Sequence, residues 1–151
     1  MGSNVIAGPG EYQTHEREAA ADVEMGHLVE YAADGRVQPH STAGGPGFTA
    51  FAIPFRSLGQ TVDHTATYDA DNDEGERVKY AFPSPGTKVP GARLAAGESV
   101  TDGDPLVSAG DGTLQAAAGD GTEDAAIVAY ANESTDNSGG AEAVRHEVIS
   151  A

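Results

Sequence analysis

A run of carboxylates in the middle of the chain has the spacing with which a calcium-binding loop begins. Asp69, Asp71 and Asp73 stand at positions 1, 3 and 5 of such a loop, where Ca²⁺ needs oxygen ligands. The pattern then fails, because position 6 is Glu74 instead of glycine and position 12 is Tyr80 instead of a bidentate glutamate. We expect a solvated acidic loop, with the three aspartates as weak candidates for a cation site and with no cofactor.

The other polar residues give little support to catalysis. The five histidines lack the spacing of metal ligands and cysteine is absent, so no zinc site is expected. Ser57, Asp63 and His64 could form a catalytic triad, but neighbours in sequence seldom point into one site. The sequence also contains no nucleophile elbow, phosphate-binding loop or dinucleotide fingerprint. It therefore predicts a protein without enzymatic activity.

Two Asp-Gly pairs predict the turns of two β-hairpins. Asp34 and Gly35 form the first pair, and Asp111 and Gly112 the second. Asp-Gly is favoured in two-residue hairpin turns, where the glycine supplies a positive φ at no steric cost. We expect these four residues to be structural.

The surroundings of the two turns are similar, at a separation of 77 residues. Five residues repeat at this offset: Val23, Gly26, Asp34, Gly35 and Gln38 correspond to Val100, Gly103, Asp111, Gly112 and Gln115. Leu28-Val29 matches Leu106-Val107 only with an offset of 78, which requires a slip at Pro105. The repetition predicts a pseudo-symmetric β unit with copies at 23–55 and 100–131. The first copy is expected to be a diverged half of one barrel or an added segment.

Short strands separated by glycine, proline and aspartate are predicted along most of the chain. Residues 76–82 alternate, with Val78, Tyr80 and Phe82 on one face, as in a half-buried strand. Further strands are expected at 27–31, 37–39, 48–55, 89–94, 106–108, 113–115, 125–130 and 143–149. A helical turn is expected only at 15–21. This pattern predicts an all-β fold, a small barrel or sandwich, with an extended arm at 1–13 and a single β domain at 14–151.

The charge of the chain is strongly negative. There are 24 acidic and 8 basic residues, which gives a net charge of −16. Such a chain repels itself in dilute buffer, whereas in molar salt the Debye length falls to roughly 3 Å and the repulsion is screened. The composition is therefore typical of a salt-adapted, haloarchaeal protein. Without a basic patch or a long apolar segment, we expect neither a nucleic-acid partner nor a membrane partner, and we expect synthesis in the cytoplasm.

Several motifs follow one another in a characteristic order between residues 68 and 149. A strand-proline-glycine passage at 78–86 precedes a Leu-Ala-Ala-Gly-Glu-Ser-Val-Thr-Asp-Gly-Asp-Pro-Leu-Val segment at 94–107. A Gly-Asp-Gly-Thr-Leu-Gln segment, an apolar strand and an Asp-Asn-Ser-Gly-Gly loop follow. In this order the chain resembles the small capsid decoration, or head-stabilisation, proteins of tailed viruses. With its acidic composition, it looks like such a protein from a virus that infects haloarchaea.

The resemblance implies a role on the outer face of an icosahedral virus shell. It implies an all-β fold, no enzymatic activity, and two kinds of partner, which are the major capsid protein and further copies of the chain in a homotrimer. We expect the N-terminal arm to order on the shell, with Val5, Ile6 and Tyr12 as candidate contact residues. A head-completion or tail protein of the same virus remains an alternative, as does a halophilic surface adhesion module.

Overall fold

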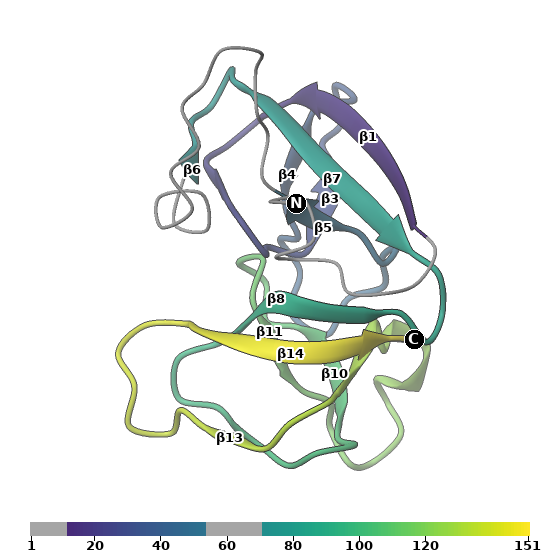
Figure 1. Ribbon diagram of the computed structural model, residues 1–151, viewed down its shortest axis with the longest axis vertical. Helices are drawn as coiled ribbons and strands as arrows, with labels where there is room; N and C mark the ends of the chain where they lie inside the picture. The colour runs from purple at the N-terminus through teal and green to yellow at the C-terminus, as the bar shows by residue number, and fades with distance from the viewer. Residues whose placement is uncertain (1–11, 54–70) are drawn as a thin grey trace.

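The protein consists almost entirely of short β-strands in two tandem sets. The computed structural model describes residues 12–53 and 71–151 of the chain, and within them strands β1–β7 are followed by strands β8–β14. We call the first set the N-terminal unit and the second set the C-terminal barrel. They form the upper and lower lobes in Figure 1. The predicted all-β fold is confirmed.

The strands are two to seven residues long. The N-terminal unit contains β1 (Tyr12–Glu18), β2 (Val23–Glu24), β3 (Val29–Tyr31), β4 (Val37–Pro39), β5 (Phe51–Ile53), β6 (Asp71–Asn72) and β7 (Arg77–Pro83). The C-terminal barrel contains β8 (Lys88–Leu94), β9 (Ser99–Val100), β10 (Pro105–Ser108), β11 (Leu114–Ala116), the 3-10 turn η2 (Asp124–Ala126), β12 (Ala129–Ala131), β13 (Thr135–Asp136) and β14 (Val144–Ser150).

The two strand sets follow the same plan. In the C-terminal barrel, five strands close in the order β10-β11-β8-β14-β12. In the N-terminal unit, the hairpin β3-β4 and the sheet β1-β7-β5 complete the same circuit through single bridges, which join Ala19 to Val37 and Leu28 to Phe51. The first sequence copy is therefore a second unit of the same plan, and the predicted barrel is confirmed for the C-terminal set.

The repeat offset of 77 residues is constant through both hairpins. Val29 pairs with Pro39 in the first hairpin, and Leu106 pairs with Ala116 in the second. Val29 is therefore equivalent to Leu106, and no slip occurs at Pro105. The predicted correspondence of Leu28-Val29 with Leu106-Val107 is wrong.

Burial explains why Leu28-Val29 and Leu106-Val107 look alike in sequence without being equivalent in the structure. Val107 is fully buried, whereas Glu30 at the equivalent position is half-buried. β10 lies against the N-terminal unit, where the Gly44 N–H donates a hydrogen bond to the carbonyl oxygen of the next residue, Ser108, at 2.8 Å. Val107 is apolar because its face of the hairpin is covered, so it does not mark the same position as Val29.

Two other predicted elements differ from the structure. Residues 15–21 were expected to form a helical turn, but β1 pairs antiparallel with β7 from Tyr12 to Glu18. Pairing along a whole strand outweighs a weak local helix preference. Tyr12, expected in the arm, is thus the first residue of β1. The predicted strand at 125–130 begins instead as η2, and the strand β12 begins only at Ala129.

A single apolar core runs through both lobes. Its largest fully buried side chains include Phe51 and Tyr80 in the N-terminal unit and Leu94 and Leu106 in the C-terminal barrel. The alternation predicted for 76–82 is confirmed at Val78 and Tyr80, which are buried, while Phe82 is only half-buried. The core is continuous, so the two lobes are packed against each other.

Candidate functional site

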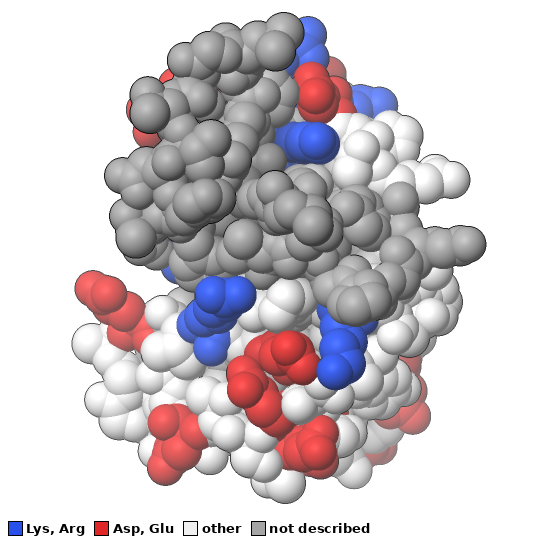
Figure 2. Space-filling model, viewed as in Figure 1, with Lys and Arg blue, Asp and Glu red and all other residues white. Residues whose placement is uncertain are grey.

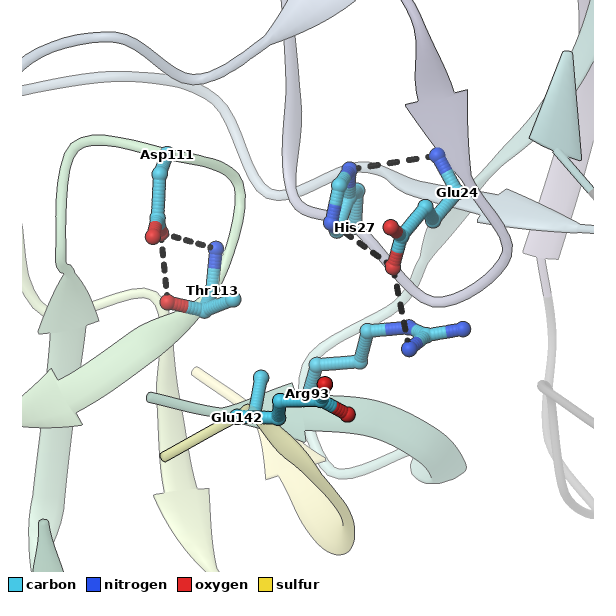
Figure 3. A pocket seen from close by; sticks show the side chains of 7 residues that line it. Glu24, His27, Arg93, Asp111, Thr113 and Glu142 are labelled. Atoms are coloured by element: carbon cyan, nitrogen blue, oxygen red, sulfur yellow. Dashed lines mark hydrogen bonds and ion pairs between the residues drawn. The ribbon is translucent and has the colours of Figure 1, made fainter. Parts of the chain in front are cut away.

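A polar cleft of about 560 Å³ lies where the N-terminal unit meets the C-terminal barrel (Figure 3). Both lobes contribute to its lining, which consists of Glu24, His27, Arg93, Asp111, Thr113, Glu142 and Ala143. The first two come from the β2–β3 turn, and the others from β8, the β10–β11 hairpin and the segment before β14. The cleft therefore depends on the docking of one lobe on the other.

An arginine at the centre of the cleft links the two lobes. Arg93 Nε donates a hydrogen bond to the Met25 carbonyl oxygen at 2.7 Å, and Arg93 Nη1 lies 3.0 Å from Glu24 Oε2. The Arg93 side chain is only 12% exposed, so water screens this ion pair less than a surface pair. The contact fixes the β2–β3 turn against β8.

A histidine closes the turn that Arg93 contacts. The Glu24 N–H donates a hydrogen bond to His27 Nδ1 at 3.2 Å, so neutral His27 carries its hydrogen on Nε2. That nitrogen lies 3.6 Å from Glu24 Oε2. In the C-terminal barrel, the Thr101 N–H donates in the same way to Asp104 Oδ2 at 2.8 Å. Because two different acceptors fill equivalent positions, the role of His27 is to stabilise the turn.

The β10–β11 turn enters the N-terminal unit beside this cleft. We call residues 111–113 the C-terminal tip. We call the part of the N-terminal unit that receives it the slot, which is formed by His27, Leu28, Pro39 and His40. The Leu28 N–H donates to the Gly112 carbonyl oxygen at 2.8 Å, and the Gly112 N–H donates to the His40 carbonyl oxygen at 3.1 Å. A Cβ atom at Gly112 would lie 2.8 Å from His27 Cγ and 2.9 Å from Pro39 Cβ. Only glycine fits this approach.

The equivalent turn of the N-terminal unit, residues 34–36, is the N-terminal tip. The Arg36 N–H donates to Asp34 Oδ1 at 3.0 Å, and Arg36 Nε lies 2.7 Å from Asp34 Oδ2. These bonds hold the pKa of the Asp34 carboxyl below its usual value. Gly35 has φ +81° and Gly112 has φ +86°. The four predicted turn residues thus lie in the two hairpin turns.

The candidate cation site is only partly within the described residues. Asp69 lies outside them, Asp71 belongs to β6, and Asp73 is exposed in the turn before β7. The residues that the structure describes contain no group of three or more histidine, cysteine, aspartate or glutamate side chains arranged to hold a metal ion. The site therefore gains no support from the described geometry.

The predicted arm and the discounted triad also fall largely outside the described chain. Val5 and Ile6 precede the first described residue, and Tyr12 is placed as a backbone partner of Pro83. Ser57, Asp63 and His64 lie in the segment 54–70, which is likewise not described. In 12–53 and 71–151, no helix has the length and apolar character needed to span a membrane.

A further histidine is buried inside the C-terminal barrel. His146 is 0% exposed, its Nδ1 lies 2.9 Å from Thr135 Oγ1, and its Nε2 has no hydrogen-bond partner within the described residues. Burial lowers the pKa of His146, while the nearby Glu133 and Glu147 carboxylates oppose that effect. The histidine is therefore held neutral.

An aromatic cluster lies on the N-terminal unit. The rings of Tyr31 and Phe48 have centroids 4.9 Å apart, and those of Phe48 and Phe82 lie 5.2 Å apart. The guanidinium carbon of Arg17 lies 4.3 Å from the Tyr31 ring centroid. Tyr31 is 39% exposed and Tyr130, on the other lobe, is 42% exposed; they are the two exposed large apolar side chains among the described residues. Tyr31 is therefore a partly exposed member of the cluster.

The sequence did not predict the residues that join the lobes. Glu24, His27 and Arg93 belong to segments for which it predicted no site, and the contact of Glu24 with Arg93 joins the two lobes. The one available signal was the repeat itself, which places Glu24 and His27 opposite Thr101 and Asp104. That comparison shows a turn, but it does not show what packs against it.

Comparisons with known proteins bear on the fold. No protein-family model matches the chain, and no curated protein matches it. Among solved structures, the chain is similar to the crystal structure of the head fiber gp8.5 N base in bacteriophage phi29, with a TM-score of 0.58 and 14% sequence identity. The likeness covers 93% of this chain and 95% of that one. Both the N-terminal unit and the C-terminal barrel are therefore parts of a fold that a virus head fiber base also has.

Proposed function

We propose that this protein is a non-enzymatic structural component of a tailed-virus head, bound to the outer surface of the capsid. The observation that carries the proposal is the likeness of fold to a bacteriophage head fiber base over nearly the whole of both chains. The order of motifs between residues 68 and 149 supports the same role independently. The protein is made in the host cytoplasm and then joins the virion.

Within this role we propose that the protein decorates the shell and stabilises contacts between major capsid subunits, as a homotrimer. Decoration suits a small chain, since many copies on a repeating lattice multiply a modest contact by avidity. A trimer matches the local threefold symmetry of an icosahedral shell. It would also cover apolar surface that a short chain with few large side chains leaves exposed.

The aromatic cluster supports the N-terminal unit as the part that faces the capsid. Tyrosine and arginine are enriched at protein interfaces, and here Arg17 stacks on the exposed Tyr31. The predicted arm contacts Val5 and Ile6 precede β1 of the same unit. Both the arm and the cluster would then take part in the capsid contact.

The proposal is tested by adding purified protein to virus heads that lack it and measuring the bound protein after sedimentation. Deletion of residues 1–11, which ends before β1, should lower occupancy, and so should Tyr31→Ser. Loss of an interface tyrosine typically costs more than about 1 kcal/mol, so we expect affinity to fall at least roughly fivefold. Tyr130→Ser is the matched control, because Tyr130 is equally exposed on the C-terminal barrel.

The number of bound copies separates the possible places on the virion. A decoration protein saturates at hundreds of copies per head, whereas a head-completion or connector ring would take up roughly six to twelve. Heads that bind no protein at all would reject the capsid role. Equal affinity of the two tyrosine variants and the deletion variant would reject the N-terminal unit as the contact.

A further inference from the structure

Both parts of the tip-and-slot contact have equivalents elsewhere in the molecule, because the N-terminal unit also has a tip and the C-terminal barrel also has a slot. By the constant offset of 77, the N-terminal tip is equivalent to the C-terminal tip. The same offset gives the C-terminal barrel a second slot. Its residues Asp104, Pro105, Ala116 and Ala117 correspond in this order to His27, Leu28, Pro39 and His40 of the first slot. If the N-terminal tip of one copy entered the second slot of the next, the contact would be heterologous. Such contacts grow into filaments unless a ring closes.

The second slot lacks the hydrogen-bond donor that the first slot uses. In the first slot, the Leu28 N–H donates to the Gly112 carbonyl oxygen. Pro105 occupies the equivalent position, and proline has no N–H. The hairpin backbone at this position remains similar, since the Pro105 carbonyl accepts from the Ala117 N–H at 2.9 Å as the Leu28 carbonyl accepts from the His40 N–H at 2.9 Å. The backbone is thus preserved while the docking donor is lost, as at strand edges that are protected from pairing.

The N-terminal tip has its docking groups already occupied within its own lobe. The Gly35 carbonyl oxygen accepts a hydrogen bond from Arg17 Nη1 at 2.6 Å, and the Gly35 N–H donates to the Ala32 carbonyl oxygen at 2.9 Å. In the C-terminal tip, both backbone groups of Gly112 bond to the slot instead. The stacking of Arg17 on Tyr31 holds the guanidinium in place. Docking of Gly35 would have to release its N–H from Ala32 and compete with Arg17 for its carbonyl oxygen.

We infer that this protein prevents its own head-to-tail association, with Pro105 blocking the second slot and Arg17 blocking the N-terminal tip. Pro105 removes the donor of the docking hydrogen bond, and Arg17 competes for its acceptor. The tip-and-slot contact is thereby confined to the two lobes of one chain. Any assembly of several copies uses other surfaces, whether or not the protein acts on a capsid.

The inference is tested by restoring both groups. Pro105→Ala returns the N–H, and Arg17→Met removes the guanidinium but keeps an unbranched side chain. Light scattering of the double variant should show an average mass that rises with protein concentration to at least twice that of the wild type. Each single variant should give a smaller rise. Circular dichroism checks that every variant is folded.

Two controls tie a gain in mass to the tip and slot. Pro90→Ala with Arg145→Met makes the same chemical changes on β8 and β14, outside both tip and slot, and should keep the wild-type mass. Adding Gly35→Leu to the double variant should abolish the gain, as a side chain at Gly112 would clash with the first slot. The inference is overturned if the double variant keeps the wild-type mass at all concentrations. It is also overturned if the wild type itself elongates and Gly35→Leu stops it.

Discussion

Among single residues, the buried His146 has the clearest link to solution conditions. Its Nδ1 lies near the Thr135 hydroxyl and 3.6 Å from Glu133 Oε1, whereas Nε2 has no hydrogen-bond partner within the described residues, so the charged ring would hold one buried N–H without a hydrogen bond. Burial disfavours the charged form more than the neighbouring carboxylates favour it, and the pKa is lowered from 6.5. Neutral His146 is thus part of the stable folded state.

The sign of the resulting pH dependence follows from this lowered pKa. The unfolded chain takes up a proton near pH 6.5 and the folded chain does not, so the contribution to stability is complete above that pH and is lost as the pH falls below it. His146→Gln should flatten the loss of unfolding free energy between pH 7 and pH 5, as measured by chemical denaturation at each pH. His15→Gln, at an exposed position, is the control. Parallel curves for wild type and His146→Gln would contradict this role.

At the scale of elements, the hairpin turns join the lobes as well as reversing the chain. The C-terminal tip satisfies two backbone groups of the N-terminal unit, and the adjacent Arg93 fixes the β2–β3 turn. A buried backbone group that loses its partner costs about 1–3 kcal/mol. The two docking bonds of Gly112 therefore form a substantial part of the contact between lobes.

This dependence predicts different effects for two glycines of nearly equal backbone geometry. Gly112 and Gly86 have φ values of +86° and +85°, but a Cβ atom would clash with the slot at Gly112 and meet nothing within 4 Å at Gly86. Gly86→Ala should cost about 1 kcal/mol from backbone strain alone. Gly112→Ala should cost about 2–4 kcal/mol, since overpacking adds to the strain. Urea denaturation measures both, and equal losses would show that the tip isn't tightly docked.

Elements that are determined by adjacent residues could be predicted from the sequence, whereas elements that depend on contacts between distant residues could not. Asp-Gly turns and the alternation around Tyr80 are determined by a few adjacent residues, so the hairpins and β7 could be predicted. The strand β1 is stabilised by pairing with β7, about 65 residues later, and its own sequence resembles a helical turn. The contact of Arg93 with Glu24 depends on how the lobes dock, which no local pattern encodes.

At the scale of the whole molecule, the negative charge comes from many acidic side chains, and many of those visible on one face lie on one lobe. Figure 2 shows acidic side chains gathered over the lower lobe, the C-terminal barrel, with few basic ones between them. Asp120 and Asp136 there have lowered pKa values because the side chains and backbone N–H groups of Thr122 and Ser138 donate to them. These carboxylates therefore stay ionised at lower pH than usual and add to the negative charge of the protein.

Salt should therefore stabilise the protein by screening. With a net charge of −16, we expect the unfolding free energy to rise by several kcal/mol between 0.1 and 3 M KCl, as the Debye length shrinks from about 10 Å to below about 3 Å. Thermal or urea unfolding across a KCl series measures the effect. Sucrose is the control, since it is excluded from the surface without screening charge. Full stability in low salt would contradict a salt-adapted protein.

The position of β14 has a consequence for the order in which the chain folds during synthesis. β14 pairs with β8 on one side and β12 on the other, so the C-terminal barrel cannot close until residue 150 has left the ribosome. The N-terminal unit emerges earlier, with its slot still empty. Gly112, which enters the slot, lies 84 residues beyond Leu28. During synthesis the N-terminal unit must therefore exist for a time without the C-terminal barrel packed against it. The N-terminal unit can therefore fold before the C-terminal barrel closes and docks against it.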